Sequence, residues 1–158
     1  MKKFVLAIDQ GTTGSTALML DHAGAVRGRG YAELPQHFPQ PGWVEHDAIE
    51  IWRSVMAAVR SALRAAHASG GAIVAIGITN QRETTLLWER KSGRPVARAI
   101  VWQDRRTEPR CAQLRRAGLE RDVRRRTGLV LDPYFSASKI EWLLSSDRAL
   151  AARAKTGA

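Results

Sequence analysis

Short apolar runs separated by polar turns dominate the first part of the chain. Three such runs, at residues 4–8, 15–20 and 26–31, are separated by segments rich in glycine, threonine or aspartate. This pattern is typical of β-strands bounded by turns. The connections are too short to carry a crossover between parallel strands, so each strand must pair antiparallel with the next. The pattern predicts a three-stranded antiparallel meander.

The apolar spacing changes after a proline-rich loop at residues 36–45. Asp47 and Glu50 form a capping box, in which Asp47 caps a helix and Glu50 reaches back. Ser69-Gly70-Gly71 is expected to end that helix. The apolar positions in between follow the i, i+3, i+4, i+7 spacing of one helical stripe, and they are Trp52, Val55, Met56, Val59, Leu63 and Ala66.

A second group of apolar runs follows this helix. Residues 73–78 (IVAIGI) contain no polar side chain, which predicts a strand buried on both faces beside a parallel neighbour. Two further strands are predicted at 84–89 and 96–102, and helices at 108–117, at 120–127 up to Gly128, and at 138–144. The order of three strands, one helix, three strands and further helices predicts an α/β domain with a mixed sheet flanked by helices.

Composition is that of a globular protein, but the positive charge could also indicate a nucleic-acid-binding protein. The 158 residues are 44% hydrophobic and 25% charged, with a net charge of +10. The surplus of positive charge is mostly arginine in the second half. Such a surplus could bind nucleic acid, because contacts with phosphates dominate that binding. Aromatic residues are not interleaved with these arginines, which fall at helical spacing among acids. We therefore expect solvated helix faces and no nucleic-acid partner.

The chain shows no signal for a membrane or for export. No apolar run approaches the roughly 20 residues that a membrane span needs. The apolar run Phe4–Ile8 is too short for the core of a signal peptide, and Asp9 interrupts it. A single cysteine, Cys111, excludes an internal disulfide and a cysteine-based zinc site. Its arginine-rich surroundings could lower the pKa of the thiol, whereas an inert cysteine on a helix face is the simpler interpretation. We expect a cytoplasmic location.

The turn after the first run has the composition of a phosphate-binding loop. Its glycines permit close backbone approach and positive φ, and its amide and threonine hydroxyl groups can surround an anion. Asp9 can hold a hydrated Mg²⁺, which prefers one or two carboxylates with waters and phosphates. The alternative is an ordinary glycine-rich hairpin with a capping aspartate. The loop is not a Walker A motif, and its sequence is Asp9-Gln10-Gly11-Thr12-Thr13-Gly14.

Four further residues have side chains that could bind a small molecule. Arg82 and Glu83 place both charge signs at the end of the apolar strand, although a surface salt bridge would have the same residues. Trp102 could pack its ring on a short carbon backbone, and Tyr134 could present its hydroxyl beside Pro133. Buried structural roles are the alternatives for these two aromatic residues.

The phosphate loop and four further segments resemble, in the same order, motifs of the glycerol kinases in the FGGY carbohydrate kinase family. The resemblance implies a ribonuclease H-like, actin-like ATPase domain. It covers residues 1–144 as an incomplete N-terminal domain, followed by a tail at 145–158, and the family's C-terminal domain is absent. The segments are residues 41–47 (PGWVEHD), 77–85 (GITNQRETT), 99–103 with 105–107 (AIVWQ, RRT) and 127–136 (TGLVLDPYFS).

The resemblance also implies an activity, the phosphorylation of glycerol by Mg·ATP to give glycerol 3-phosphate and ADP. It assigns the general base to an aspartate beyond residue 158, so no catalytic residue is expected in this chain and the chain alone should be inactive. A homo-oligomer or a missing C-terminal half would be its partner. Nucleotide phosphates and the metal are assigned to Asp9, Gly11, Thr12, Thr13, Gly14 and Thr16, and glycerol to Arg82, Glu83, Trp102 and Tyr134.

One position departs from the family pattern. Thr16 stands where these kinases usually have an arginine near the nucleotide phosphates, and a hydroxyl supplies no fixed positive charge. Weaker nucleotide binding is therefore expected. Two other functions stay open: another FGGY sugar kinase, acting on xylulose or gluconate, and a non-catalytic domain that is vestigial or half of a split enzyme. The kinase interpretation requires the phosphate loop and the Arg82–Glu83 pair to face one another across a shared cleft.

Overall fold

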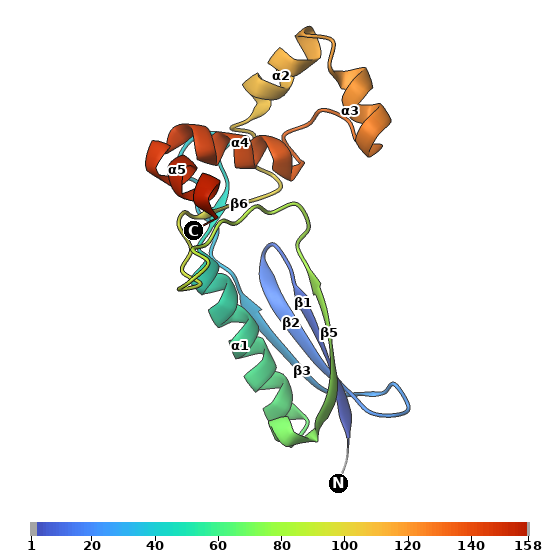
Figure 1. The fold of residues 1–158 in the computed structure, drawn as a ribbon. Helices are drawn as coiled ribbons and strands as arrows, with labels where there is room; N and C mark the ends of the chain where they lie inside the picture. Colours follow the sequence, from blue (N-terminus) through green and yellow to red (C-terminus); the bar gives the residue numbers. More distant parts are fainter. Residues whose placement is uncertain (1–2, 158) are drawn as a thin grey trace. The chain divides into compact units, whose positions relative to one another are not determined.

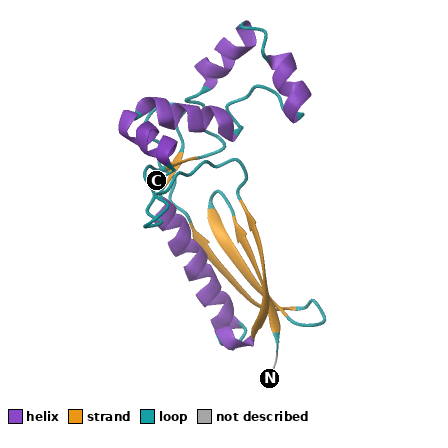
Figure 2. Cartoon of the chain, in the orientation of Figure 1, coloured by secondary structure: helices purple, strands orange, loops and turns teal. Residues whose placement is uncertain are grey.

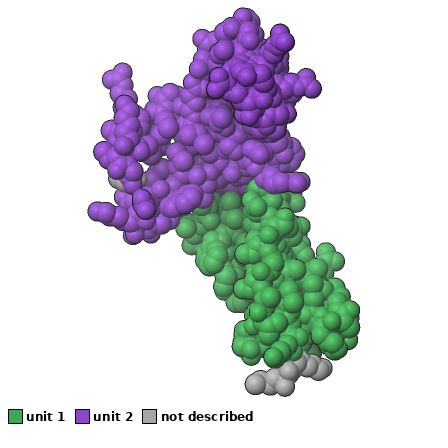
Figure 3. Space-filling model, turned by 45° about the vertical axis from the view of Figure 1, so that its right-hand side comes forward, with its two compact units in different colours: residues 1–36, 47–81 green, residues 37–46, 82–158 purple. Residues whose placement is uncertain are grey.

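The structure of the chain is a computed structural model that describes residues 3–157. The chain forms two compact units (Figure 3). Among the described residues, unit 1 comprises 3–36 and 47–81, and unit 2 comprises 37–46 and 82–157.

Unit 1 is built on a four-stranded sheet with the order β3-β2-β1-β5 (Figure 1). The first three strands form the predicted antiparallel meander, and β5 pairs with β1 in the predicted parallel direction. The sheet is therefore mixed, as expected. The strands are β1 (Phe4–Gln10), β2 (Gly14–Leu20), β3 (Val26–Glu33) and β5 (Ile73–Asn80).

Helix α1 (Ala48–Ala65) begins at the predicted cap. The side chain of Asp47 accepts hydrogen bonds from the backbone N–H groups of Ile49, at 2.7 Å, and Glu50, at 3.3 Å. These bonds satisfy donors that a helix N-terminus otherwise leaves unpaired. The helix ends before the predicted glycines, with His67 in the left-handed conformation at φ 49°. The glycines instead lie in a short 3₁₀ turn, Gly70–Ala72.

Small residues allow α1 to approach the sheet closely. Gly30 on β3 faces the helix so closely that a Cβ atom there would lie 2.0 Å from the carbonyl oxygen of Ala58 and 2.7 Å from the backbone nitrogen of Ala62. Both alanines are fully buried. Trp52, predicted to lie on the buried stripe, is 62% exposed instead. The close contact with β3 selects the alanine face of α1, so the bulky side chain of Trp52 lies outside it.

Strand β5 is not buried on both faces as predicted. Its side chains Val74, Ile76 and Ile78 are 58%, 58% and 73% exposed. Helix α1 contacts mainly β2 and β3, and within unit 1 no other described helix covers β5. The sequence of an apolar strand shows which side chains favour burial. It does not show whether another segment of the chain packs over them.

Unit 2 consists mainly of helices and loops (Figure 2). The predicted helices at 108–117, 120–127 and 138–144 are all present with small changes in length, and Gly128 ends the second with φ 75°. The segment expected to be a tail contains a further helix, capped by Asp147, which accepts from Ala149 N at 2.8 Å. The helices are α2 (Glu108–Arg116), α3 (Glu120–Thr127), α4 (Ser136–Ser146) and α5 (Arg148–Thr156).

The two strands predicted at 84–89 and 96–102 form only an irregular hairpin. Backbone hydrogen bonds join Thr85 to Ile100, Leu87 to Val96 and Glu89 to Arg94. Between the first two of these pairs the returning arm has two more residues than the outgoing arm, which breaks the regular ladder. Only β6 (Ala99–Ile100) is a strand there, and it pairs antiparallel with β4 (Glu45–His46).

Many of the arginines in unit 2 pair with acids on the helix surfaces. This pairing is the one expected of solvated helix faces. The pairs include Arg115–Glu108 at 2.5 Å, Arg125–Asp122 at 2.6 Å, Arg126–Asp122 at 2.8 Å and Arg110–Glu141 at 2.8 Å.

Candidate active site

The loop between β1 and β2 is held by its carbonyl groups. The side-chain amide of Gln10 donates to the carbonyl of Gly11 at 2.7 Å, and that of Gln36 donates to the carbonyl of Thr12 at 2.7 Å. The backbone N–H of Leu34 donates to the carbonyl of Thr13 at 2.9 Å. Three consecutive carbonyl groups of the loop therefore point at donors within unit 1.

This anchoring sets the direction of the loop's amide groups. In a planar trans peptide the N–H points opposite to the C=O of the same unit, and residues 3–157 contain no cis peptide bond. The N–H groups of Thr12, Thr13 and Gly14 are therefore directed away from the three anchoring donors. Phosphate-binding loops hold an anion with successive backbone N–H groups.

Gly14 is required by packing and not by backbone conformation. A Cβ atom at Gly14 would lie 2.5 Å from the hydroxyl oxygen of Tyr31 on β3 and 2.7 Å from the carbonyl oxygen of Ala32. A Cβ at Gly11 would lie 3.0 Å from the carbonyl oxygen of Gly14. Neither glycine has the positive φ that the sequence suggested, and the close contacts that both glycines allow are with atoms of the same chain.

Asp9 lies in a row of polar residues across three strands. It is level with Thr16 on β2 and with Thr79 on β5. Because side chains alternate along a strand, these three lie on the face opposite to the one that buries Leu6 against α1. Asp9 is exposed, as a carboxylate that binds a hydrated cation must be. No three His, Cys, Asp or Glu side chains among residues 3–157 gather into a metal site.

Three of the four residues predicted to bind glycerol lie together in unit 2. The rings of Trp102 and Tyr134 meet edge to face with centroids 5.8 Å apart, and Tyr134 meets Phe135 in the same way at 5.1 Å. Glu83 contacts Ser136, the residue that follows Phe135 in the chain. Its Oε2 accepts a hydrogen bond from the Ser136 hydroxyl at 2.9 Å. The Glu83 carboxylate is thereby bonded to the segment that carries the Tyr134 ring, which itself contacts Trp102.

Glu83 is held in an unusual backbone conformation. Its φ of 63° lies in the left-handed region, which few non-glycine residues adopt unless their surroundings hold them there. Its Oε2 also accepts from the backbone N–H of Ser136 at 3.3 Å, so this carboxylate caps the N-terminus of α4. Arg82, the fourth candidate, precedes it and is exposed.

A buried ionic cluster that was not identified from the sequence holds the loop after Trp102. Asp104 is fully buried. Its carboxylate accepts from Val44 N at 2.7 Å, from Arg106 N and Nε at 2.9 Å, and from Arg106 Nη2 at 2.8 Å. The guanidinium of Arg106 lies 3.7 Å from the ring centroid of Trp43 and 4.7 Å from that of Trp142. The Arg105-Arg106 dipeptide suggested only surface charge, and no local signal separates the buried arginine from its exposed neighbour.

Lys139 on α4 is a second residue that sequence reasoning missed. It is fully buried, and its Nζ donates to the carbonyl oxygens of Pro133 and, at 3.2 Å, of Tyr134. Burial lowers the pKa of its ammonium group below the usual value. A lysine between apolar helix positions would suggest only a stem that extends to solvent.

The two groups of candidates belong to different units. Asp9, Gly11, Thr12, Thr13, Gly14 and Thr16 are in unit 1, whereas Arg82, Glu83, Trp102 and Tyr134 are in unit 2. The shared cleft required by the kinase interpretation stays a prediction.

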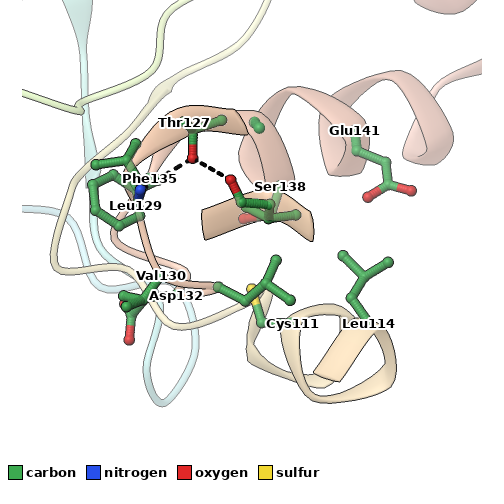
Figure 4. A pocket seen from close by; sticks show the side chains of 12 residues that line it. Cys111, Leu114, Thr127, Leu129, Val130, Asp132, Phe135, Ser138 and Glu141 are labelled. Atoms are coloured by element: carbon green, nitrogen blue, oxygen red, sulfur yellow. Dashed lines mark hydrogen bonds between the residues drawn. The ribbon is translucent and has the colours of Figure 1, made fainter. Parts of the chain in front are cut away.

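Cys111 on α2 lines an apolar cavity of about 240 Å³ inside unit 2 (Figure 4). The cavity lies among α2, α3 and α4, with walls that include Leu114, Val123 and Phe135. Burial raises the pKa of the Cys111 thiol, and a hydrogen bond from Ser138 opposes this effect only partly. The structure therefore does not support a reactive thiol whose pKa is lowered by nearby arginines.

We expect the Cys111 thiol to react slowly in the folded chain. At pH 8 its reaction with 5,5′-dithiobis(2-nitrobenzoic acid) should be at least about tenfold slower than in the urea-unfolded chain, because only the thiolate attacks and a raised pKa reduces its fraction. The rate should start to rise at a higher pH than for N-acetylcysteine, the reference thiol. Equal rates before and after unfolding would show that the thiol is accessible and ionises normally.

The fold and the loop define the class of protein. An antiparallel three-stranded meander with a parallel fourth strand, a helix on one face and a phosphate-type loop after β1 match the actin-like, ribonuclease H-like ATPase fold of sugar kinases. Residues 4–157 match the signature of the "FGGY family of carbohydrate kinases, N-terminal domain". The chain belongs to this family.

Relatives within the family are glycerol kinases. The chain is 60% identical over 142 residues to the glycerol kinase of Bordetella pertussis, and 57% identical over 154 residues to that of Methylibium petroleiphilum. These matches cover 90% and 98% of the chain but only 28% and 31% of the relatives. The crystal structure of Plasmodium falciparum glycerol kinase with ADP superposes with a TM-score of 0.88 at 31% identity, covering 99% of this chain and 31% of that one. The chain thus spans under one third of the length of these relatives.

No helix among the described residues combines the length and the apolar character that crossing a bilayer requires.

Proposed function

We propose that the protein to which this chain belongs phosphorylates glycerol at the expense of ATP. The observation that carries the proposal is the grouping of Glu83, Trp102 and Tyr134 in unit 2. Glycerol presents three hydroxyl groups on a short carbon backbone, which needs hydrogen-bond partners at fixed angles and an apolar wall. The identity of the chain to glycerol kinases favours this acceptor over other polyols.

In this proposal each acceptor residue has a separate task. The Glu83 carboxylate accepts a hydrogen bond from a glycerol hydroxyl, while the guanidinium of Arg82 donates to one or two hydroxyl oxygens. Both bonds to Ser136 use Oε2 of Glu83, so Oε1 is not constrained by them. The rings of Trp102 and Tyr134 cover the carbon backbone and exclude water from one side of it. These residues position the acceptor, and positioning supplies most of the catalysis in phosphoryl transfer.

The loop between β1 and β2 is assigned to the nucleotide. ATP supplies the phosphoryl group, and a Mg²⁺ ion neutralises charge on its phosphates. Amide groups of Thr12, Thr13 and Gly14 are directed away from the anchoring donors, and Asp9 offers one exposed carboxylate to a hydrated metal. Thr16, level with Asp9 on the same face, adds a hydroxyl but no charge, which is consistent with modest nucleotide affinity. The proton acceptor is assigned to an aspartate outside this chain.

A chimera tests the proposal, with this chain in place of the matching N-terminal segment of the Bordetella pertussis glycerol kinase. ADP formation should depend on glycerol. Glu83→Gln should lower kcat/KM for glycerol by about 10- to 100-fold, the effect of losing one hydrogen bond to a charged group. Glu89→Gln, a half-exposed glutamate of the same unit, is the matched control and should leave kcat/KM unchanged.

Several outcomes would contradict this assignment. A folded chimera that prefers xylulose or gluconate would identify a different FGGY sugar kinase. A folded chimera that is inactive with all three acceptors would indicate a non-catalytic domain. The 158-residue chain alone should give ADP at the background rate, and turnover above background would overturn the placement of the proton acceptor outside it.

A further inference from the structure

Three side chains of helix α4 contact the residues predicted to bind glycerol or segments next to them. Ser136, Lys139 and Trp142 are spaced three residues apart. Ser136 donates to the carboxylate of Glu83. Lys139 holds the backbone that carries the Tyr134 ring. Trp142 packs on the guanidinium of Arg106, the ion partner of Asp104 in the loop that follows Trp102.

Lys139 is the central and least expected of these side chains. It is fully buried, and among the described residues it makes no ion pair with a carboxylate. Its Nζ is satisfied by the carbonyl oxygens of Pro133 and Tyr134 instead. Removing an ammonium group from water is costly, so an apolar side chain of similar volume would serve packing alone at least as well.

The two carbonyl groups that Lys139 binds flank a critical position. They belong to Pro133 and Tyr134, while the N–H of Tyr134 is held from the other side by Asp132 Oδ1 at 2.8 Å. The backbone on both sides of the Tyr134 side chain is therefore fixed, and the ring is directed at Trp102. Without Lys139, the carbonyls of Pro133 and Tyr134 would lose a buried donor, and this turn could rotate.

We propose that Lys139 is a positioning residue of the acceptor site: by binding the carbonyl groups of Pro133 and Tyr134, it fixes the Tyr134 ring against Trp102 for contact with glycerol. This inference rests on the proposed function. Lys139 acts through Tyr134 and does not touch the acceptor.

Kinetics of the chimera separate positioning from simple stability. Lys139→Met should raise KM for glycerol by about 10- to 100-fold, the effect of an ångström-scale misplacement, and leave KM for ATP within about twofold. A merely structural defect would lower kcat per total protein and change neither KM. Lys91→Met, which removes an exposed lysine of the same unit, should behave like the unmodified chimera. Unchanged KM for glycerol in a folded Lys139→Met protein would overturn the inference.

A second measurement uses the 158-residue chain itself. The indole N–H resonance of Trp102 should shift in Lys139→Met and stay in place in Lys91→Met, because the Tyr134 ring lies against that indole. If Lys139→Met fails to fold, Lys139→Gln, which keeps an amide donor on a shorter side chain, should still shift the Trp102 resonance and raise KM for glycerol relative to the unmodified protein. An unshifted resonance in a folded variant would overturn the inference. An inactive unmodified chimera would overturn the proposed function alone, since the resonance test does not need turnover.

Discussion

Gly30→Ala should destabilise unit 1 by about 3 kcal/mol, the upper part of the usual range for overpacking a well-packed interior. The added methyl group would lie 2.0 Å from the carbonyl oxygen of Ala58 and 2.7 Å from the nitrogen of Ala62. These are backbone atoms of a helix, so they cannot move aside as the end of a flexible side chain could. Either α1 separates from β3 along its length or β3 is displaced within the sheet. Urea unfolding followed by circular dichroism at 222 nm measures the loss.

Gly77→Ala is the matched control for this prediction. Gly77 lies on β5 and does not have positive φ, and a methyl group added there would have open space within 4 Å. Its replacement should change the free energy of unfolding by no more than about 0.5 kcal/mol, as for most exposed positions. Equal effects of the two substitutions would show that the α1–β3 contact is looser than the structure has it.

Asp104→Asn should destabilise unit 2 by about 3–5 kcal/mol, the cost of breaking a buried charge pair from one side. Each carboxylate oxygen accepts two hydrogen bonds, Oδ1 from Arg106 N and Nε and Oδ2 from Val44 N and Arg106 Nη2. Whichever way the new amide turns, its NH₂ group faces two donors. Glu45 remains as a partner of Arg106 at 2.8 Å, but it cannot replace the bond to Val44.

Tryptophan fluorescence in a urea titration checks this second prediction, because Trp43 and Trp142 flank the affected guanidinium. Glu141→Gln is the control. Its ion pair with Arg110 is nearly half exposed on both sides, and such pairs contribute at most about 1 kcal/mol. A loss of similar size in both variants would mean that water reaches Asp104.

The meander and the start of α1 could be predicted from the sequence because both depend on local chemistry. Short polar turns at residues 9–14 and 21–25 force antiparallel neighbours, and the Asp47 side chain caps the helix that follows it. Gly128 likewise ends α3 with positive φ. These features need only residues that are close along the chain, so a pattern in the sequence can determine them.

Predictions about burial failed where they depended on distant segments. Ile78 is exposed on β5, and Trp52 is exposed on α1, although both fit the apolar pattern of their elements. The choice of the alanine face on α1 depends on Gly28 and Gly30 of another strand. A single helical stripe does not contain that information.

The residues of the candidate site likewise divide into those that the sequence identified and those that it did not. The acceptor residues Glu83, Trp102 and Tyr134 were identified from family motifs, and unit 2 brings these three together. Asp104 and Lys139 were not identified, because a buried charge is recognised only from its partners. Those partners lie up to 60 residues away along the chain for Asp104, and for Lys139 they are backbone carbonyls that any sequence would provide.

The two edges of the unit 1 sheet differ in a way that determines how the sheet can grow. The outer strand β3 includes Arg27, Arg29 and Glu33, and charged side chains on an edge strand discourage pairing with another chain. The opposite outer strand, β5, has no charged residue over its eight positions. Its outer N–H and C=O groups form a template bordered by Ile76 and Ile78. The charges on β3 therefore disfavour the addition of a strand there, whereas β5 carries no such charges, so the sheet favours growth at the β5 edge.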